Sequence, residues 1–296
     1  MSDRTDPPDG APQLVPDKYF FAFVLVTSLF ALWGFANNLT DPMVKAFQEV
    51  FRLETWQGSL VQFAFYGGYA TMAIPAALVI RKASFKVGII CGLGLYATGA
   101  LLFIPASIAM QFWLFLISLY ILTFGLAFLE TAANPYILSM GAPETATRRL
   151  NLAQAFNPVG SILGATVAAQ LVMPMLWVSD FRGEQQKAHP EYAEMMPAEV
   201  DGLLNAALDG YVAENPAEFR ERQVHDLGVI RAPYIVIALV VLAVLATFIV
   251  SAMPNTGHSE DPIHLFEVLR NLATFRYLGG VVAQTVYVGA QIMCWT

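Results

Sequence analysis

Residues 33–42 read WGFANNLTDP, in which the amide of Asn37 and the acid of Asp41 stand five and one residues before Pro42. Positions four apart share one helix face, and a proline removes the hydrogen bond to the carbonyl one turn back. The stretch ends a long apolar run, so it predicts a membrane helix with one polar face. An acid at such depth suggests a functional site, because inserting a charge at a helix centre costs roughly 2.5–3.5 kcal/mol.

A second stretch, residues 126–135, repeats this arrangement as LAFLETAANP, with Glu130 and Asn134 in the same two places before Pro135. The two copies lie three predicted spans apart, and an odd number of spans reverses the direction of the chain. The copies are therefore expected to be inverted in the membrane. Inverted repeats with interrupted helices mark the substrate site in many secondary transporters.

The composition is that of a membrane protein. Of 296 residues, 56% are hydrophobic and 13% are charged, with a mean hydropathy of +0.54; soluble domains have about 25% charged residues. The net charge of −7 argues against a nucleic-acid partner. Long apolar stretches predict an all-α polytopic fold with six complete transmembrane helices, near 19–41, 57–80, 86–105, 111–139, 150–177 and 232–253.

Five segments follow from this pattern. Residues 1–18, rich in Pro and Asp, are expected to be a disordered cytoplasmic tail, and residues 19–253 to form the six-helix bundle. Within the bundle, 178–231 is expected to be a long acidic external loop. Residues 254–276 would be a cytoplasmic linker, and 277–296 the truncated helix 7 of a missing C-terminal bundle.

The acidic loop contains one helical signal. After Pro197, apolar residues recur at helical spacing, which predicts a short amphipathic helix, since proline is favourable at a helix start. Such a helix could cover the outer mouth of a transport cavity. It could equally be an insertion with no role in transport, because external loops tolerate insertions.

Basic residues in short loops set the expected orientation. Arg81, Lys82 and Lys86 follow the second predicted helix, and Arg148 and Arg149 follow the fourth. Both loops should face the cytoplasm, which places the N-terminus on the cytoplasmic side of a multi-pass protein.

Asp41 and Glu130 each allow two interpretations. Asp41 either carries a proton in a watery cavity or is an acid near the outer helix end, solvated by the interface. Glu130 lies in nearly uncharged sequence, where desolvation favours its neutral form. It either exchanges protons or makes a structural hydrogen bond as a permanently protonated acid.

The fifth predicted helix carries amides and small residues together. Gly160 and Gly164 are spaced as GxxxG, which is typical of close helix packing rather than chemistry. Gln154 and Asn157 could bind a substrate or join helices by hydrogen bonds. Amides and aromatic rings also share faces elsewhere, namely Gln62, Tyr66 and Tyr69, and Gln284, Tyr287 and Gln291. This combination suits a sugar, whose hydroxyls need hydrogen bonds and whose C–H faces need flat apolar surfaces.

These motifs together resemble a known family. The run 31–41, ALWGFANNLTD, with 129–135, LETAANP, and 150–157, LNLAQAFN, closely resembles the L-fucose:proton symporter family of the major facilitator superfamily. Residues 287–291, YVGAQ, followed by Cys294 and Trp295, look like its seventh helix. The resemblance covers nearly the whole chain outside the tail and the acidic loop.

The resemblance implies a twelve-helix, two-bundle transporter of a bacterial-type inner membrane that works by alternating access. By position, Asp41 and Glu130 match the family's proton-coupling acids, and the substrate is expected to be a monosaccharide of the fucose, galactose or glucose type. No cofactor is expected besides the coupling proton. The substrate-binding residues are expected to be Trp33, Asn37, Asn38, Glu130, Asn134, Gln154, Asn157, Tyr287 and Gln291.

The sequence departs from the superfamily at one loop. The usual Gly-x-x-x-Asp-Arg pattern after helix 2 is present only as IRKASFK at 80–86, without its aspartate. Three alternatives stay open: an uncoupled facilitator or exporter of another small polar solute, a fragment without transport activity, and an intramembrane enzyme using Asp41 and Glu130 as an acid pair. For the enzyme alternative, the sequence offers neither a nucleophile motif nor metal ligands, so a non-enzymatic function is predicted.

Overall fold

The computed structural model describes residues 12–253, 270 and 274–293, and the whole described chain is helical or loop. The predicted linker falls mostly outside these residues, as do residues 1–11, Cys294 and Trp295. The side chains of Asp41 and Gln291 are also outside the description, although both lie on helical backbone. Two compact units are present, one up to His258 and a second from Ser259 onward.

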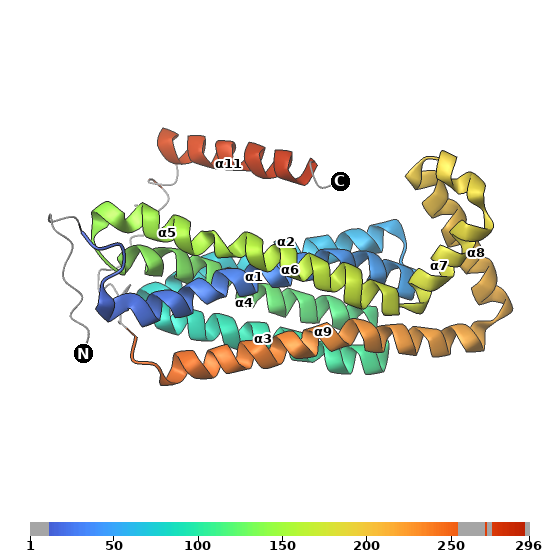
Figure 1. Cartoon of the computed structure of the whole chain (residues 1–296), viewed down its shortest axis with the longest axis horizontal. Helices are drawn as coiled ribbons and strands as arrows, with labels where there is room; N and C mark the ends of the chain where they lie inside the picture. Colours follow the sequence, from blue (N-terminus) through green and yellow to red (C-terminus); the bar gives the residue numbers. More distant parts are fainter. Residues whose placement is uncertain (1–11, 254–269, 271–273, 294–296) are drawn as a thin grey trace, which may run out of the picture. The chain divides into compact units, whose positions relative to one another are not determined.

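The first unit is a bundle of helices that run along a common direction (Figure 1). Its long helices are α1 (Asp17–Phe51), α2 (Thr55–Lys82), α3 (Phe85–Ala109), α4 (Phe112–Ser139) and α9 (Pro216–Val250). A composite rod completes it, made of η1 (Pro143–Thr145), α5 (Ala146–Gln154), α6 (Phe156–Val167), the π-helical turn η2 (Ala168–Val172) and η3 (Met173–Met175). The second unit contains α11 (Phe275–Met293).

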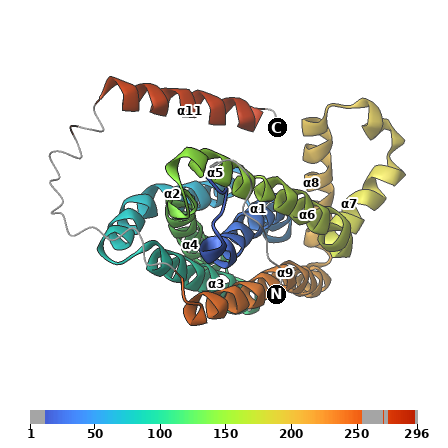
Figure 2. The same ribbon diagram turned by 60° about the vertical axis from the view of Figure 1, so that its left-hand side comes forward.

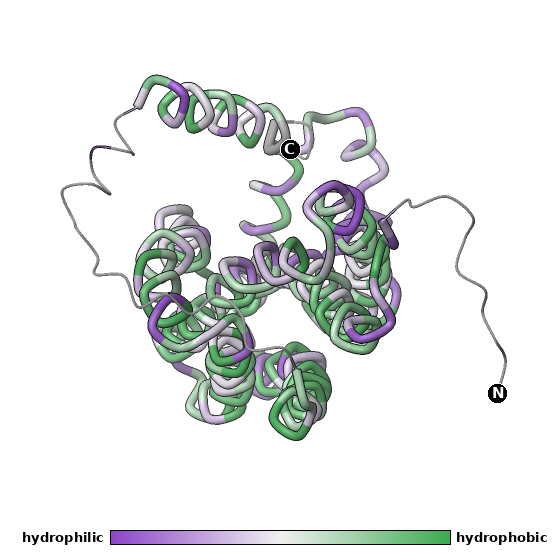
Figure 3. Tube along the Cα trace, turned by 90° about the vertical axis from the view of Figure 1, so that its left-hand side faces the viewer, coloured by the Kyte–Doolittle hydropathy of each residue, from purple (hydrophilic) through white to green (hydrophobic). Residues whose placement is uncertain are grey.

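Six of these segments are long and apolar enough to cross a membrane. Hydrophobic residues predominate along the bundle helices in Figure 3. A helix suits this environment because it satisfies its own backbone hydrogen bonds where no water is present. The all-α fold with six spanning helices, predicted from the sequence, is confirmed.

Both consecutive helices and helices far apart in sequence pack together in the bundle (Figure 2). Helix α1 packs along α6, α2 packs along α4, and α3 lies between α4 and α9. The short connection between α2 and α3 contains a helix cap. The Ser84 hydroxyl accepts a hydrogen bond from the Val87 amide at 3.2 Å, and α3 begins at the next residue.

Neither Pro42 nor Pro135 ends its helix. Helix α1 continues beyond Pro42 to Phe51, and α4 continues beyond Pro135 to Ser139. Each proline still removes one backbone hydrogen bond. Packing against neighbouring helices holds the rest of each turn, so the two prolines weaken their helices locally without interrupting them.

Glycines allow α1 and α6 to touch through their backbones. A Cβ atom added at Gly160 would overlap the Ala31 carbonyl, and one added at Gly34 would overlap the Asn157 carbonyl. Gly164 is equally close to α1. The interpretation of Gly160 and Gly164 as packing residues is confirmed, because any side chain there would push the helices apart.

The segment expected to be an external loop is largely helical. It contains α7 (Trp177–Ala188), η4 (Pro190–Glu194), α8 (Pro197–Glu214) and the first turns of α9. We call these parts the α7–α8 subdomain. The predicted amphipathic helix is present as α8, with Leu204 and Leu208 buried, although Leu203 is exposed.

Aromatic rings form the core of the α7–α8 subdomain, and polar contacts fasten it to the end of α1. Trp177, Phe181, Tyr211 and Phe219 contact one another in this core. The Arg182 guanidinium lies 3.3 Å from the Glu49 carboxylate, and both side chains are nearly buried. Arg52 also pairs with Asp209, and the Gln223 amide donates to the Val50 carbonyl at 2.7 Å.

One buried acid begins α7 from another helix. Asp226, on α9, is 2% exposed, and its two carboxylate oxygens accept hydrogen bonds from the backbone amides of Trp177 at 2.8 Å and Val178 at 3.0 Å. These amides are the first of α7 and have no partner within the helix. Asp226 therefore joins α7 to α9.

Asp226→Ala is expected to destabilise the α7–α8 subdomain by about 1–3 kcal/mol, because two buried amides lose their acceptors. Limited proteolysis of the purified protein in detergent, followed with time, measures the opening of this subdomain. Asp226→Asn should give an intermediate rate, since it keeps one oxygen. The exposed acid Asp180, also in the first turn of α7, provides the control Asp180→Ala; equal cleavage rates in the two alanine variants would contradict the prediction.

Candidate functional site

Polar side chains from α1, α2 and α4 meet around Tyr69. The Trp33 indole N–H on α1 donates to the Tyr69 hydroxyl on α2 at 2.8 Å. The Asn37 amide, one turn further along α1, is within hydrogen-bonding reach of the same hydroxyl, and the Glu130 carboxyl on α4 acts on it electrostatically. Two predicted site residues on α1 and one on α4 therefore share a single neighbour on α2.

Glu130 is half-buried in the helix bundle. Among the described residues, no Lys, Arg or His side chain forms an ion pair with its carboxyl. An uncompensated carboxyl in a low-dielectric site is more stable when it is neutral. The site can therefore hold a proton on Glu130, provided that the charged form gains water or a partner in another state.

Asn37 retains an unused acceptor. Its Oδ1 atom is buried and has no hydrogen-bond partner in the described part of the chain. Native structures contain few such atoms, because an unmade hydrogen bond in a buried site is costly. A sugar hydroxyl could supply the missing donor.

The second predicted pair, Glu130 and Asn134, behaves differently from the first. The Asn134 amide nitrogen donates to the Glu130 backbone carbonyl at 3.1 Å, and its Oδ1 accepts from the Gln154 side chain on α5 at 3.0 Å. Asn134 thus joins α4 to α5. Gln154 is exposed and keeps its carbonyl oxygen for another donor.

Two further amides donate to the backbone of α1. Asn157 donates to the Phe30 carbonyl at 3.3 Å and so joins α6 to α1. Asn38 donates to the Gly34 carbonyl of its own helix at 3.2 Å. Both amides therefore offer a ligand their carbonyl oxygens more readily than their N–H groups.

The remaining predicted residues are placed only in part. Asp41 lies on the backbone of α1, one turn after Asn37 and directly before Pro42. Tyr287 lies on α11 with an exposed side chain, and Gln291 follows one turn later on the same helix. These two belong to the second compact unit and are described by that helix alone.

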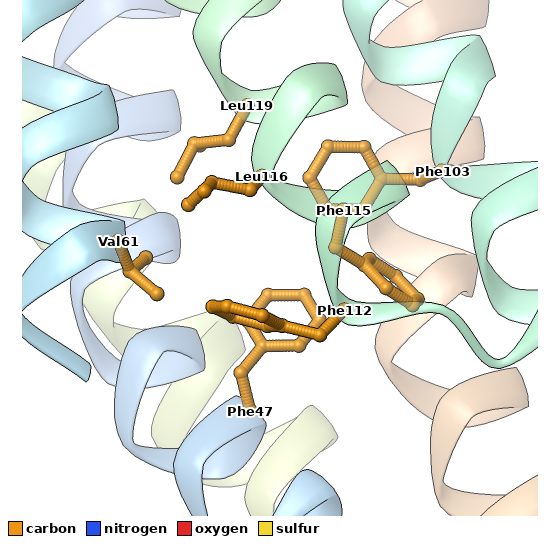
Figure 4. A pocket seen from close by; sticks show the side chains of 7 residues that line it. All are labelled: Phe47, Val61, Phe103, Phe112, Phe115, Leu116 and Leu119. Carbon is orange, nitrogen blue, oxygen red and sulfur yellow. The ribbon is translucent and has the colours of Figure 1, made fainter. Parts of the chain in front are cut away.

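A small pocket elsewhere in the bundle differs from this site in its chemistry. Its lining, shown in Figure 4, consists of the apolar side chains of Phe47, Val61, Phe103, Phe112, Phe115, Leu116 and Leu119. No residue of this lining can donate or accept a hydrogen bond through its side chain. The pocket therefore suits packing rather than recognition of a polar solute.

Tyr69 is not among the site residues that the sequence predicts. Helical spacing groups Tyr69 with Gln62 and Tyr66 on one face of the second predicted helix, and this grouping is the available signal. The structure separates the three: Gln62 and Tyr66 are exposed, whereas Tyr69 is partly buried against α1. Contact with Trp33 is what distinguishes it.

Comparisons with known proteins agree on one group of relatives. The chain is 48% identical over 286 residues to the L-fucose-proton symporter of Haemophilus influenzae, which covers 96% of this chain and 62% of that protein. It is 36% identical to the L-fucose-proton symporter of Escherichia coli, over 94% of this chain and 59% of that protein. The glucose/galactose transporter of Brucella abortus is 32% identical over 93% of this chain and 57% of its own length. No family model matches the chain.

Solved structures give the same result. A major facilitator superfamily transporter, FucP, crystallised in the outward conformation, superposes with a TM-score of 0.71 at 33% identity, covering 94% of this chain and 62% of that one. The crystal structure of a variant of the Escherichia coli fucose:proton symporter superposes with a TM-score of 0.70. These relatives are transporters rather than enzymes, and this chain spans about three fifths of their length.

Proposed function

Because this chain is homologous to the L-fucose-proton symporters of the major facilitator superfamily over nearly its whole length, we propose that the protein carrying it takes up a monosaccharide together with protons. The observation that supports this most directly is the meeting of Trp33, Asn37 and Glu130 around Tyr69. An aromatic ring and an amide suit a sugar, and an uncompensated acid beside them suits a proton.

The proposed cycle uses alternating access. Protonation of Asp41, Glu130 or both removes negative charge from the cavity, so that sugar binding and inward switching become favourable. Deprotonation on the cytoplasmic side then releases both. Coupling of this kind requires that proton and sugar each bind the two facing states with different affinities.

The rest of the architecture follows from the same proposal. The six spanning segments form the first of two bundles, with the N-terminus and residues 254–276 on the cytoplasmic side of a bacterial inner membrane. The α7–α8 subdomain then lies on the outer side. Tyr287 and Gln291 on α11 are proposed as further substrate-binding residues.

The substrate is proposed to be L-fucose, with galactose or glucose as the second candidate. The proposal of L-fucose rests on the two L-fucose-proton symporters. The proposal of galactose or glucose rests on the glucose/galactose transporter of Brucella abortus. Competition by fucose, galactose, glucose and N-acetylglucosamine against labelled L-fucose uptake ranks these candidates. An uncoupled facilitator is distinguished by counterflow without any pH gradient.

The test is uptake of L-fucose by the full protein in proteoliposomes with an imposed pH gradient, acidic outside. Accumulation above the external concentration is expected, together with its collapse when a protonophore dissipates the gradient. A gradient of one unit supplies about 1.4 kcal/mol per proton, which corresponds to a tenfold sugar ratio. Equal uptake with and without the gradient would overturn proton coupling while leaving sugar transport in place.

A further inference from the structure

The hydrogen bond between Trp33 and Tyr69 has only one possible direction. An indole N–H is a donor and never an acceptor, so the Tyr69 oxygen must accept it across 2.8 Å. Both side chains are partly buried between α1 and α2. The indole ring therefore has one fixed polar anchor, and that anchor is on another helix.

Tyr69 can serve more groups than Trp33 alone. A phenol hydroxyl accepts two hydrogen bonds and donates one. After Trp33, its polar neighbours are the Asn37 amide, the Glu130 carboxyl and the Tyr66 hydroxyl. Its own proton is thus available to a polar group on the α4 side of the site or to a sugar hydroxyl placed there.

Building on the proposed function, we propose that Tyr69 is a positioning residue, whose hydroxyl holds the Trp33 indole in the orientation that contacts the sugar ring. A flat ring recognises a sugar only when its face is presented to the C–H groups. An indole has two side-chain torsions, and the hydrogen bond from Nε1 restrains both. Without the acceptor, the indole N–H is left unsatisfied and the ring leaves this orientation.

The test compares L-fucose uptake by Tyr69→Phe and wild type in proteoliposomes under one fixed pH gradient. Phenylalanine keeps the ring and its packing and removes only the oxygen. KM is expected to rise about tenfold, the loss typical of one unmade hydrogen bond, while the maximal rate stays within about twofold. Trp33→Phe, which removes the donor instead, is expected to raise KM at least as much.

The double variant Trp33→Phe/Tyr69→Phe separates positioning from general packing. If Tyr69 acts through Trp33, its removal adds nothing once the indole is absent, so the double variant should match Trp33→Phe alone. If the two residues acted independently, the fold-increases in KM of the two single variants would multiply in the double variant. Sugar-dependent quenching of the fluorescence of Trp33, obtained by difference against Trp33→Phe, should shrink in Tyr69→Phe.

A matched control removes the same atom from another contact between helices. The Tyr120 hydroxyl on α4 is 3.0 Å from the Thr71 hydroxyl on α2, and Tyr120→Phe should leave KM unchanged. An unchanged KM in Tyr69→Phe, or effects that multiply in the double variant, would overturn the positioning role. If wild type itself takes up no sugar, the proposed function fails first, so the two failures are distinguishable.

Discussion

Replacing Glu130 with glutamine is expected to abolish gradient-driven accumulation of L-fucose while leaving sugar exchange across the membrane. Glutamine has nearly the shape of a protonated glutamic acid, but it cannot lose a proton. Glu130 forms no ion pair among the described residues, and burial of an unpaired carboxyl favours its neutral form. The variant therefore imitates the loaded state permanently.

Two measurements distinguish sugar exchange from gradient-driven accumulation. Counterflow of labelled L-fucose should stay within a few-fold of wild type. The accumulation ratio under a one-unit pH gradient should fall from about ten to one, because no proton moves with the sugar. The result for Asp41→Asn shows whether the two acids share this role or whether one of them carries it.

The control for this experiment is another glutamate with a water-exposed side chain. Glu144, in η1, is exposed, and Glu144→Gln should leave both counterflow and accumulation unchanged. Normal accumulation in Glu130→Gln would contradict proton transfer through this carboxyl. Loss of counterflow together with accumulation would instead show that the charge of Glu130 is needed to bind or move sugar.

Arg149→Ala is expected to cause a large loss of stability. Arg149 is fully buried at the start of the fifth span. Its guanidinium donates to four backbone carbonyls and one hydroxyl, belonging to Ile137, Leu138, Ala142, Leu14 and Thr145. These contacts join the end of α4, the turn after it and the segment before α1.

The physical reason lies at the end of α4. Its last carbonyls have no partner within the helix, and they carry the negative end of the helix dipole. The buried guanidinium donates hydrogen bonds to these carbonyls, and its positive charge interacts favourably with the helix dipole. Alanine would leave these carbonyls buried and unpaired, at a cost of at least about 3 kcal/mol in the free energy of unfolding.

Thermal unfolding of the purified protein in detergent, followed by tryptophan fluorescence, measures this loss. Arg149→Lys should recover only part of it, because a lysine offers a point charge instead of a planar fork. The neighbouring Arg148 is exposed, so Arg148→Ala is the matched control. Similar unfolding temperatures for the two alanine variants would show that the buried contacts contribute little.

Arg149 also illustrates the limit of reading residues from sequence alone. In the sequence, Arg148 and Arg149 are equivalent, since each is a basic residue of a short loop and indicates its orientation in the membrane. The fold buries one and exposes the other. The distinction depends on the Ile137 carbonyl at the end of α4 and on the Leu14 carbonyl, which is far from Arg149 in the chain.

In the candidate site, too, some features follow from the spacing of residues in one helix and others only from the packing of helices. Helical spacing placed Trp33 and Asn37 on one face of α1, and that follows from local geometry. No spacing rule could join them to Tyr69, because this contact requires α1 and α2 to pack in one register. Asn134 likewise looked equivalent to Asp41 by position, yet the packing of α5 on α4 pairs it with Gln154.

The sequence by itself determined the lengths of the apolar segments and the spacing of residues within single helices. An apolar segment in a membrane forms a helix because its backbone groups must find their hydrogen-bond partners within the segment. On that basis the spanning helices, the close packing at Gly160 and the unusual acid at Glu130 could all be predicted. Only the tertiary structure decided that α1 continues beyond Pro42, that Arg149 is buried and that Tyr69 meets Trp33. Each of these depends on which surfaces of separate helices come into contact, and that is set by the packing of the whole bundle.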